Sequence, residues 1–138
     1  MRTVIVLLLM LSILIAACGT NTDSEAGNSV VDEPIDVTTL RERASDLDGE
    51  TVTVRSSYWS DGQTQYLSDI MMESYPPQIP VDQAVILVGE LPSEVFDALN
   101  HADPSFAQIT WGDVEITGRV VAGEHVQLEI VEALIPEA

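Results

Sequence analysis

The sequence predicts a mainly β fold, in which five strands form a small barrel with one helix between the third and fourth strands and a short helix ahead of the first. Two observations lead to this prediction. Five stretches after residue 50 either alternate apolar and polar residues or stay apolar for several positions, as β-strands do. Helical spacing of apolar residues occurs only just before residue 50 and around residues 92–100. We therefore expect one domain, residues 38–138, with a single hydrophobic core.

The two helices each have a recognisable start. Thr39 as N-cap and Glu42 three residues later form a capping box for the first helix, which Asp48-Gly49 ends. Pro92 suits the first turn of the second helix, expected over residues 92–100. The apolar faces comprise Leu40, Ala44 and Leu47 in the first helix and Val95, Phe96 and Leu99 in the second.

The strands are separated by residues that favour turns or exclude regular pairing. Asp61-Gly62 predicts a hairpin after the first strand. Three prolines within residues 73–80 interrupt pairing between the second and third strands. A long loop is expected around residues 101–104, and Gly118 predicts a bulge or a close backbone approach in the fourth strand. The expected strands are 50–59, 65–67, 84–88, 111–120 and 126–130.

Two segments carry a resemblance to a known fold. Residues 47–55, Leu-Asp-Gly-Glu-Thr-Val-Thr-Val-Arg, resemble the first strand of many OB-fold domains, and residues 114–120 resemble a fourth strand. The resemblance covers residues 47–135 and implies a five-stranded Greek-key barrel. It also implies ligand binding on the face of the second and third strands and the adjoining loops.

The N-terminus has the pattern of a secretory leader. Arg2 is followed by an apolar run over residues 4–17 and by small residues, which predicts a signal peptide over residues 1–17. Ile15-Ala16-Ala17-Cys18 resembles the lipobox of bacterial lipoproteins, which implies that Cys18 is lipidated and becomes the first residue of the mature chain. The alternatives are a secreted protein with an incidental cysteine and an uncleaved anchor. An apolar helix of this length reaches only about 21 Å against a hydrocarbon core of about 30 Å, so it makes a poor permanent span.

A tether and a strongly acidic domain are expected after the leader. Residues 18–37 are rich in Gly, Ser, Thr, Asn and acidic residues, which predicts a flexible acidic tether. The chain contains five basic residues (Lys plus Arg) and 23 acidic residues (Asp plus Glu). Its formal net charge at pH 7 is therefore −18. This charge argues against nucleic acid as a partner and against direct docking on an anionic membrane surface. The acidity either keeps an exported protein soluble or recruits a cationic partner or divalent cations.

A second resemblance concerns the proline-rich segment. Residues 73–78, Glu-Ser-Tyr-Pro-Pro-Gln, resemble a segment of uncharacterised actinobacterial-type lipoproteins, in which a cysteine follows the glutamine. Here Ile79 takes that place, and Cys18 is the only cysteine, so the disulfide that the resemblance implies is absent. The resemblance implies no activity.

No pattern in the chain predicts a catalytic or metal site. Residues 46–50 partly resemble a Ca²⁺-binding loop, but they lack the further oxygen ligands at the required spacing. We therefore interpret them as a helix end followed by a strand. His101, Asp103 and His125 form a metal site only if two distant loops meet. We therefore expect no catalytic residue, no metal and no cofactor.

The aromatic residues are the best candidates for ligand binding. They lie on or near the first, second and fourth strands and the proline-rich segment, and they either close the ends of the barrel or form a binding face. If Val52 and Val54 point inward, Trp59 lies on the opposite face of its strand. The candidate residues are Tyr58, Trp59, Tyr66, Tyr75 and Trp111.

These observations favour a non-enzymatic binding or scaffolding module, anchored by lipid at the cell membrane on its extracytoplasmic face. The expected partners are the membrane itself, through the N-terminal lipid, and an envelope protein or glycan. One alternative is an accessory subunit of an envelope enzyme or transporter. Another is a hydrolase of envelope polymers, which the many carboxylates of the chain neither support nor exclude.

Overall fold

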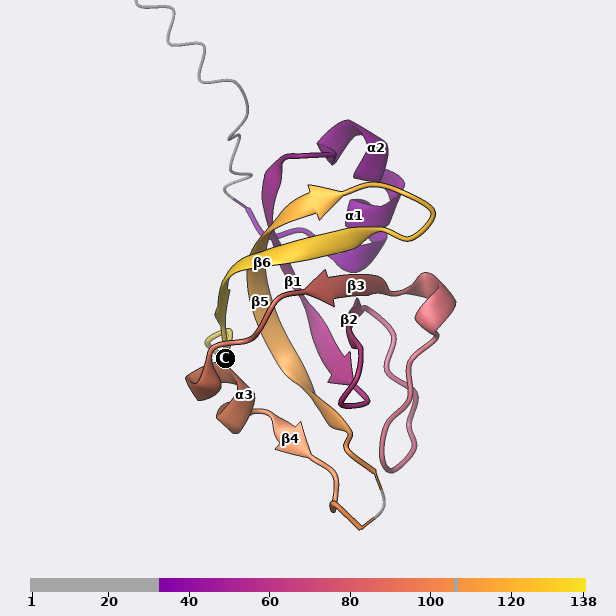
Figure 1. Cartoon of the computed structure of the whole chain (residues 1–138), viewed down its shortest axis with the longest axis vertical. Coiled ribbons are helices and arrows are strands. Elements are labelled where there is room, and N and C mark those ends of the chain that lie inside the picture. The colour runs from indigo at the N-terminus through magenta and orange to yellow at the C-terminus, as the bar shows by residue number, and fades with distance from the viewer. Residues whose placement is uncertain (1–32, 106) are drawn as a thin grey trace, which may run out of the picture.

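The computed structural model describes residues 33–105 and 107–138 and confirms a mainly β protein with a closed five-stranded barrel (Figure 1). The predicted leader of residues 1–17, Cys18 and most of the expected tether lie outside the described residues. The strands are β1 (Thr51–Ser60), β2 (Gln65–Ser68), β3 (Val85–Val88), β4 (Asn100–His101), β5 (Thr110–Val121) and β6 (Gln127–Leu134). The helices are α1 (Val37–Glu42), α2 (Ala44–Leu47), the 3-10 helix η1 (Val81–Gln83) and α3 (Ser93–Ala98).

The barrel closes because β1 pairs on one edge with β2 and on the other with β5. The order around the barrel is β1-β2-β3-β6-β5, and all these neighbours are antiparallel except β3 and β6, which run parallel. The predicted hairpin joins β1 and β2, where the Asp61 carboxylate accepts the backbone N–H groups of Gln63 and Thr64. The architecture is that of an OB-fold-like barrel.

The core fills the barrel, and the helices close its ends. Alternate residues of the strands point inward, which is the period-two pattern that predicted them. The first helical region contributes the predicted face of Leu40, Ala44 and Leu47, all buried. In Figure 1, α1 and α2 cover the upper end of the barrel, and α3 lies at the lower left. The largest fully buried side chains are Tyr58, Leu40, Leu67, Ile116 and Leu128.

The first helix begins earlier than predicted. Its N-cap is Asp36, not Thr39, and the Asp36 carboxylate accepts the Thr39 N–H at 2.7 Å. Asp69, from the end of β2, accepts the N–H groups of Val37 at 3.0 Å and Thr38 at 2.8 Å. These two carboxylates satisfy the free donors of the first turn, so the helix starts at Val37. The helical path breaks at Arg43 between α1 and α2.

Asp69 therefore connects a remote strand to the first helix. Partial burial acts to raise the pKa of Asp69, but hydrogen bonds from Thr38, Val37 and Ser56 outweigh it and hold the pKa below its ordinary value. The carboxylate is consequently ionised under neutral conditions. This contact contributes stability above pH 4 or so, and that contribution is lost as the pH falls through the lowered pKa of Asp69.

The segment between α3 and β5 differs from the expected long loop. Asn100 and His101 form β4, a two-residue strand that pairs with Trp111 and Thr110 at the edge of β5. The second helix is accordingly shorter than residues 92–100. Val95 of α3 and Leu99, the residue after the helix, are buried as predicted, but Phe96 is 41% exposed and lies against the His101 ring.

The close backbone approach predicted at Gly118 is confirmed, whereas the bulge lies on the partner strand. Thr117 pairs with Glu132 and Gly118 with Ile130, so the extra residue of the irregularity is Val131 of β6. A methyl group on Gly118 would lie 2.6 Å from the Glu129 carbonyl oxygen and 2.7 Å from Leu128 Cγ. Both approaches are too short for carbon, so the fold requires glycine at this position.

We predict that Gly118→Ala destabilises the barrel by about 1–3 kcal/mol, because the methyl group overlaps backbone and core atoms that resist displacement. The matched control is Gly123→Ala in the β5–β6 turn, where the nearest atom would be 3.7 Å away. Urea unfolding of both variants measures the difference. Equal stability of the two variants would contradict the close approach at Gly118.

Candidate binding face

The five candidate aromatic residues separate into one core residue and four residues outside the barrel. Tyr58 shares the inward face of β1 with Val52 and Val54 and is only 1% exposed. Its hydroxyl donates to Gln65 Oε1 at 3.0 Å, and burial raises the pKa of Tyr58 above its ordinary value. Tyr58 is therefore a core side chain, so the prediction that it contributes to a binding face is wrong.

The strand register aligns three of the other rings on the outer face of the sheet. Trp59 on β1 pairs with Trp111 on β5 and with Tyr66 on β2. Paired residues on adjacent strands share a face, so the three rings form one row across the barrel. The row continues to Asn100 beyond Trp111 and to Ile86 beyond Tyr66. The structure thus brings together residues that are up to 52 positions apart in the chain, Trp59 and Trp111.

Trp59 lies in this row but is covered by a loop. It is 7% exposed, and its Nε1 donates to the Pro77 carbonyl oxygen at 2.9 Å. The proline-rich segment and the β4–β5 connection fold over it and form a second apolar cluster outside the barrel. The buried members of this cluster are Trp59, Ile79, Ala102 and Ile109.

Tyr75 and Trp111 are the aromatic pair that remains accessible. The Tyr75 side chain is 73% exposed, and its ring meets the half-buried Trp111 ring edge-on at a centroid distance of 6.1 Å. The loop that carries Tyr75 is internally bonded, because Met72 donates its N–H to the Gln78 carbonyl and the Ser74 hydroxyl donates to the Pro76 carbonyl. This exposed pair is held in place by the second cluster beneath it.

At the other end of the row, Tyr66 borders a hollow in the surface. The hollow has a volume of about 360 Å³ and lies over β2 and β3, the face on which OB-folds bind ligands. Arg41 from α1 and His125 from the β5–β6 turn form its rim. The Arg41 guanidinium donates to the carbonyl oxygens of Asp82 and Gln83, which connects α1 to η1 ahead of β3.

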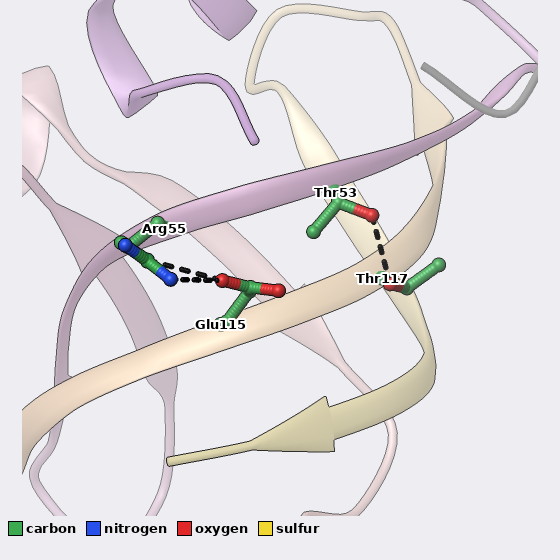
Figure 2. Close-up of polar contacts among 4 residues, drawn as sticks. All are labelled: Thr53, Arg55, Glu115 and Thr117. Atoms are coloured by element: carbon green, nitrogen blue, oxygen red, sulfur yellow. Dashed lines mark hydrogen bonds and ion pairs between the residues drawn. The ribbon is translucent and has the colours of Figure 1, made fainter. Parts of the chain in front are cut away.

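A ladder of polar pairs covers the rest of the outer face of β1 and β5. Figure 2 shows two of these pairs, the Thr53–Thr117 hydroxyl contact at 2.9 Å and the Arg55–Glu115 ion pair at 2.8 Å. The next pair along the strands is Ser57, which donates its hydroxyl to Asp113 at 2.9 Å. The Trp59–Trp111 pair follows directly, so polar and aromatic surfaces adjoin on the same two strands.

The described residues hold no arrangement typical of a metal centre. They contain no group of three or more His, Cys, Asp or Glu side chains that could hold a metal ion. His101 is bonded instead to the Thr110 hydroxyl and the Phe96 carbonyl. Residues 46–50 comprise the end of α2 and the turn that leads to β1, and Asp48 accepts the Ala122 N–H.

The polar ladder was missed as a candidate surface by the sequence analysis. Its members are ordinary serine, threonine and acidic residues, and only the register of β1 against β5 makes them neighbours. The one available signal was alternation, which places Ser57 on the same side as Trp59. The partner strand and its register have no local signature.

Comparison with known proteins identifies no relative of this chain. No protein-family model, no curated protein and no solved structure matches the chain. Among residues 33–105 and 107–138, no helix is long and apolar enough to cross a membrane. The candidate site therefore depends on the geometry of the barrel face itself.

We predict that Trp59 and Tyr75 differ in their effect on folding. Trp59→Phe leaves the Pro77 carbonyl without its donor and opens a void under the loop, which costs about 1–3 kcal/mol. Tyr75→Ala removes a mostly exposed ring and costs less than about 1 kcal/mol. Chemical denaturation of both variants measures the free energy of unfolding. A larger loss from Tyr75→Ala than from Trp59→Phe would show that the roles are reversed.

Proposed function

We propose that this protein is a lipid-anchored binding or scaffolding module on the extracytoplasmic face of the cell membrane. The observation that carries the binding role is the contact between the exposed Tyr75 ring and the half-buried Trp111 ring on the outer barrel face. Rigid aromatic side chains provide a large contact area at a small cost in conformational entropy, and they are enriched in binding surfaces. The partner is an envelope component, either a protein or a glycan.

The anchoring role rests on the leader and on Cys18. Signal peptidase cleavage before Cys18 leaves a cysteine at the mature N-terminus, with its thiol in a thioether to a diacylglyceryl group. Two acyl chains give stable membrane attachment, whereas one chain gives only marginal attachment. The barrel then needs no membrane-binding surface of its own, which agrees with its strongly acidic character.

Three carboxyl groups of the described residues have pKa values below their ordinary value. Hydrogen bonds from the Thr64 and Gln63 backbone lower the pKa of Asp61, and bonds from Ser105 lower that of Asp103. Asp69 is lowered as well. A general acid needs a raised pKa to carry its proton at neutral pH, so these three carboxylates are poor proton donors.

We predict that a photo-crosslinking amino acid at position 75, such as benzoylphenylalanine, captures a discrete envelope component in living cells. The control places the same amino acid at Val131, which is similarly exposed at 69% and lies on β6. Crosslinks at position 75 and not at position 131 support a binding face. An absence of crosslinks at position 75, with the variant folded and exported, contradicts the binding role. A crosslink to an envelope enzyme or transporter would specify an accessory subunit.

We predict that a tagged fatty acid supplied to cells labels the wild-type protein and not Cys18→Ala, because the thioether needs the Cys18 sulfur. Ser12→Ala, a change in the same leader, is the control and should remain labelled. The labelled band is detected after denaturing electrophoresis. Equal labelling of wild type and Cys18→Ala would remove the lipid anchor from the proposal.

A further inference from the structure

β4 is a strand edge that the sheet leaves open. It comprises Asn100–His101 and comes last in the strand order, with β5 on one side and no strand of the described residues on the other. Both residues are exposed, and Figure 1 shows β4 at the margin of the molecule below α3. An open edge of this kind can pair with an added strand through its backbone groups.

The hydrogen-bond pattern shows which backbone groups of β4 face the open edge. The Ala102 N–H donates to the Ile109 carbonyl at 2.8 Å, directly beyond the His101–Thr110 pair. Hydrogen-bonded and non-hydrogen-bonded pairs alternate in an antiparallel ladder, so His101 and Thr110 form a non-hydrogen-bonded pair. The N–H and C=O groups of His101 therefore point away from β5. Neither group pairs with a backbone group of the described residues.

Two cavities border β4 on opposite faces. The Asn100 cavity, about 830 Å³, is lined by Asn100 and by Asp113 of β5. The His101 cavity, about 400 Å³, is lined by His101 and by its pair partner Thr110. Successive residues of a strand face opposite sides, and paired residues share a side. The two cavities therefore lie on the two sides of a strand added at this edge.

We propose that the β4 edge binds an extended segment of a basic partner protein, which pairs with His101 and places alternate side chains in the two cavities. The inference goes beyond the proposed function, because neither cavity is lined by Tyr75 or Trp111. The peptide residue that pairs with His101 faces the His101 cavity, and its two neighbours face the Asn100 cavity. Backbone bonds then provide affinity, and the cavities provide specificity.

The Asn100 cavity fits a long basic side chain. Its apolar lining includes Leu99 and Ile135, and its acidic lining includes Asp113 and Glu137. A lysine or arginine side chain buries its methylene groups on apolar surface while its charged end remains with water or a carboxylate. The mixture of apolar wall and carboxylates therefore matches both parts of such a side chain.

The charge of the Asn100 cavity favours a basic partner over this chain itself. The lining carboxylates are those of Asp36, Asp69, Asp113 and Glu137. Arg55, the one lining cation among the described residues, is paired with Glu115 at 2.8 Å. A second copy would bring a further net charge of −18, and residues 18–32 contain acidic residues and no basic one. Both occupants would meet like charge, whereas a basic peptide is attracted.

The His101 cavity fits an apolar side chain. Its lining includes Phe96, Pro104 and Ile109. The Phe96 ring is 41% exposed and contacts the His101 ring at a centroid distance of 4.9 Å. An apolar side chain opposite His101 would cover this ring and remove it from water. The preferred segment therefore alternates basic and apolar residues.

The first test is titration of the full chain, purified in lauryldimethylamine oxide, into fluorescein-labelled peptides. The probe is Lys-Val-Lys-Val-Lys-Val. One control, Lys-Lys-Lys-Val-Val-Val, has the same composition without alternation, and another, Glu-Val-Glu-Val-Glu-Val, has the opposite charge. Fluorescence anisotropy measures binding, with detergent alone as the blank. We expect a Kd of about 0.1 mM or below for the probe and binding about tenfold weaker or worse for each control.

N-methylated peptides test the backbone pairing with the wild-type protein. The valine opposite His101 donates its N–H to β4, whereas the lysine N–H groups point away from the strand. N-methylation of the valines should therefore weaken binding about tenfold or more. N-methylation of the lysines should leave the Kd within about twofold.

Two substitutions of His101 locate the site. His101→Pro removes the N–H at the open edge, a position where a strand tolerates proline because the neighbouring strand does not use that donor. His101→Ala likewise removes the imidazole and its contacts to Thr110 and Phe96, but it keeps the N–H. We expect His101→Pro to weaken probe binding about tenfold or more and His101→Ala by less than about threefold. Circular dichroism confirms folding, and the N-methylated peptides test the same pairing if His101→Pro does not fold.

A matched pair of charge substitutions tests the Asn100 cavity. Asp113→Asn removes the charge but keeps the oxygen that accepts from Ser57. Glu124→Gln removes the same charge in the β5–β6 turn, outside both cavities. We expect Asp113→Asn to weaken probe binding about threefold or more, and Glu124→Gln to leave it within about twofold.

Any of three results would overturn the inference: the probe does not bind, it binds no better than the control without alternation, or methylation of the valines leaves binding unchanged. A peptide-free dimer that His101→Pro dissociates, measured by sedimentation, would make a second copy the occupant and also overturn it. If the probe fails but position 75 crosslinks in cells, the inference is wrong and the proposed function stands. If the probe binds but position 75 captures nothing, the inference stands and the Tyr75–Trp111 binding face is wrong.

Discussion

The pairing of β1 with β5 closes the barrel, and both faces of the molecule depend on it. Ten consecutive residues, Thr51–Ser60, pair with the complementary run of β5. One set of alternate residues becomes the core, from Val52 to Tyr58, and the other becomes the outer surface, from Thr53 to Trp59. The register is fixed by burial, since a slip of one residue would move every core side chain to solvent. Gly118 of β5 allows this strand to lie close to the backbone of β6 without a steric clash.

The second apolar cluster gives the outer face its order. In a barrel of this size the outer face is ordinarily solvated, but here two connecting loops fold back on it and bury Trp59. The hydrogen bond from Trp59 to Pro77 ties the proline-rich segment to β1 and thereby positions Tyr75 against Trp111. One aromatic side chain is thus used for structure, and two neighbouring ones are left for contact. Burial, and not residue type, distinguishes the two roles.

The sequence predicted what depends on local periodicity and missed what depends on remote partners. The five barrel strands, the hairpin and the constraint at Gly118 were all predicted, because each has a signature within a few residues. The start of α1 was misplaced because Asp69, 32 residues from Val37, completes its cap. Two-residue β4 has no periodicity to detect. Tyr58 was misassigned although alternation from Val54 already placed it inside. The cavity lined by Arg55, Asn100 and Asp113 has no local signal, because β1, β4 and β5 each supply only part of it.

Ile35 lies just ahead of α1 and adds a short parallel bridge to the edge of β1 at Val54. Its N–H donates to the Thr53 carbonyl at 2.9 Å, and its carbonyl accepts the Arg55 N–H at 3.0 Å. A tensile load applied to the chain ahead of Glu33 reaches these two bonds first, and then the Asp69 contacts to Val37 and Thr38. Ile35 therefore fixes the place at which the chain joins the edge of β1 before it enters α1.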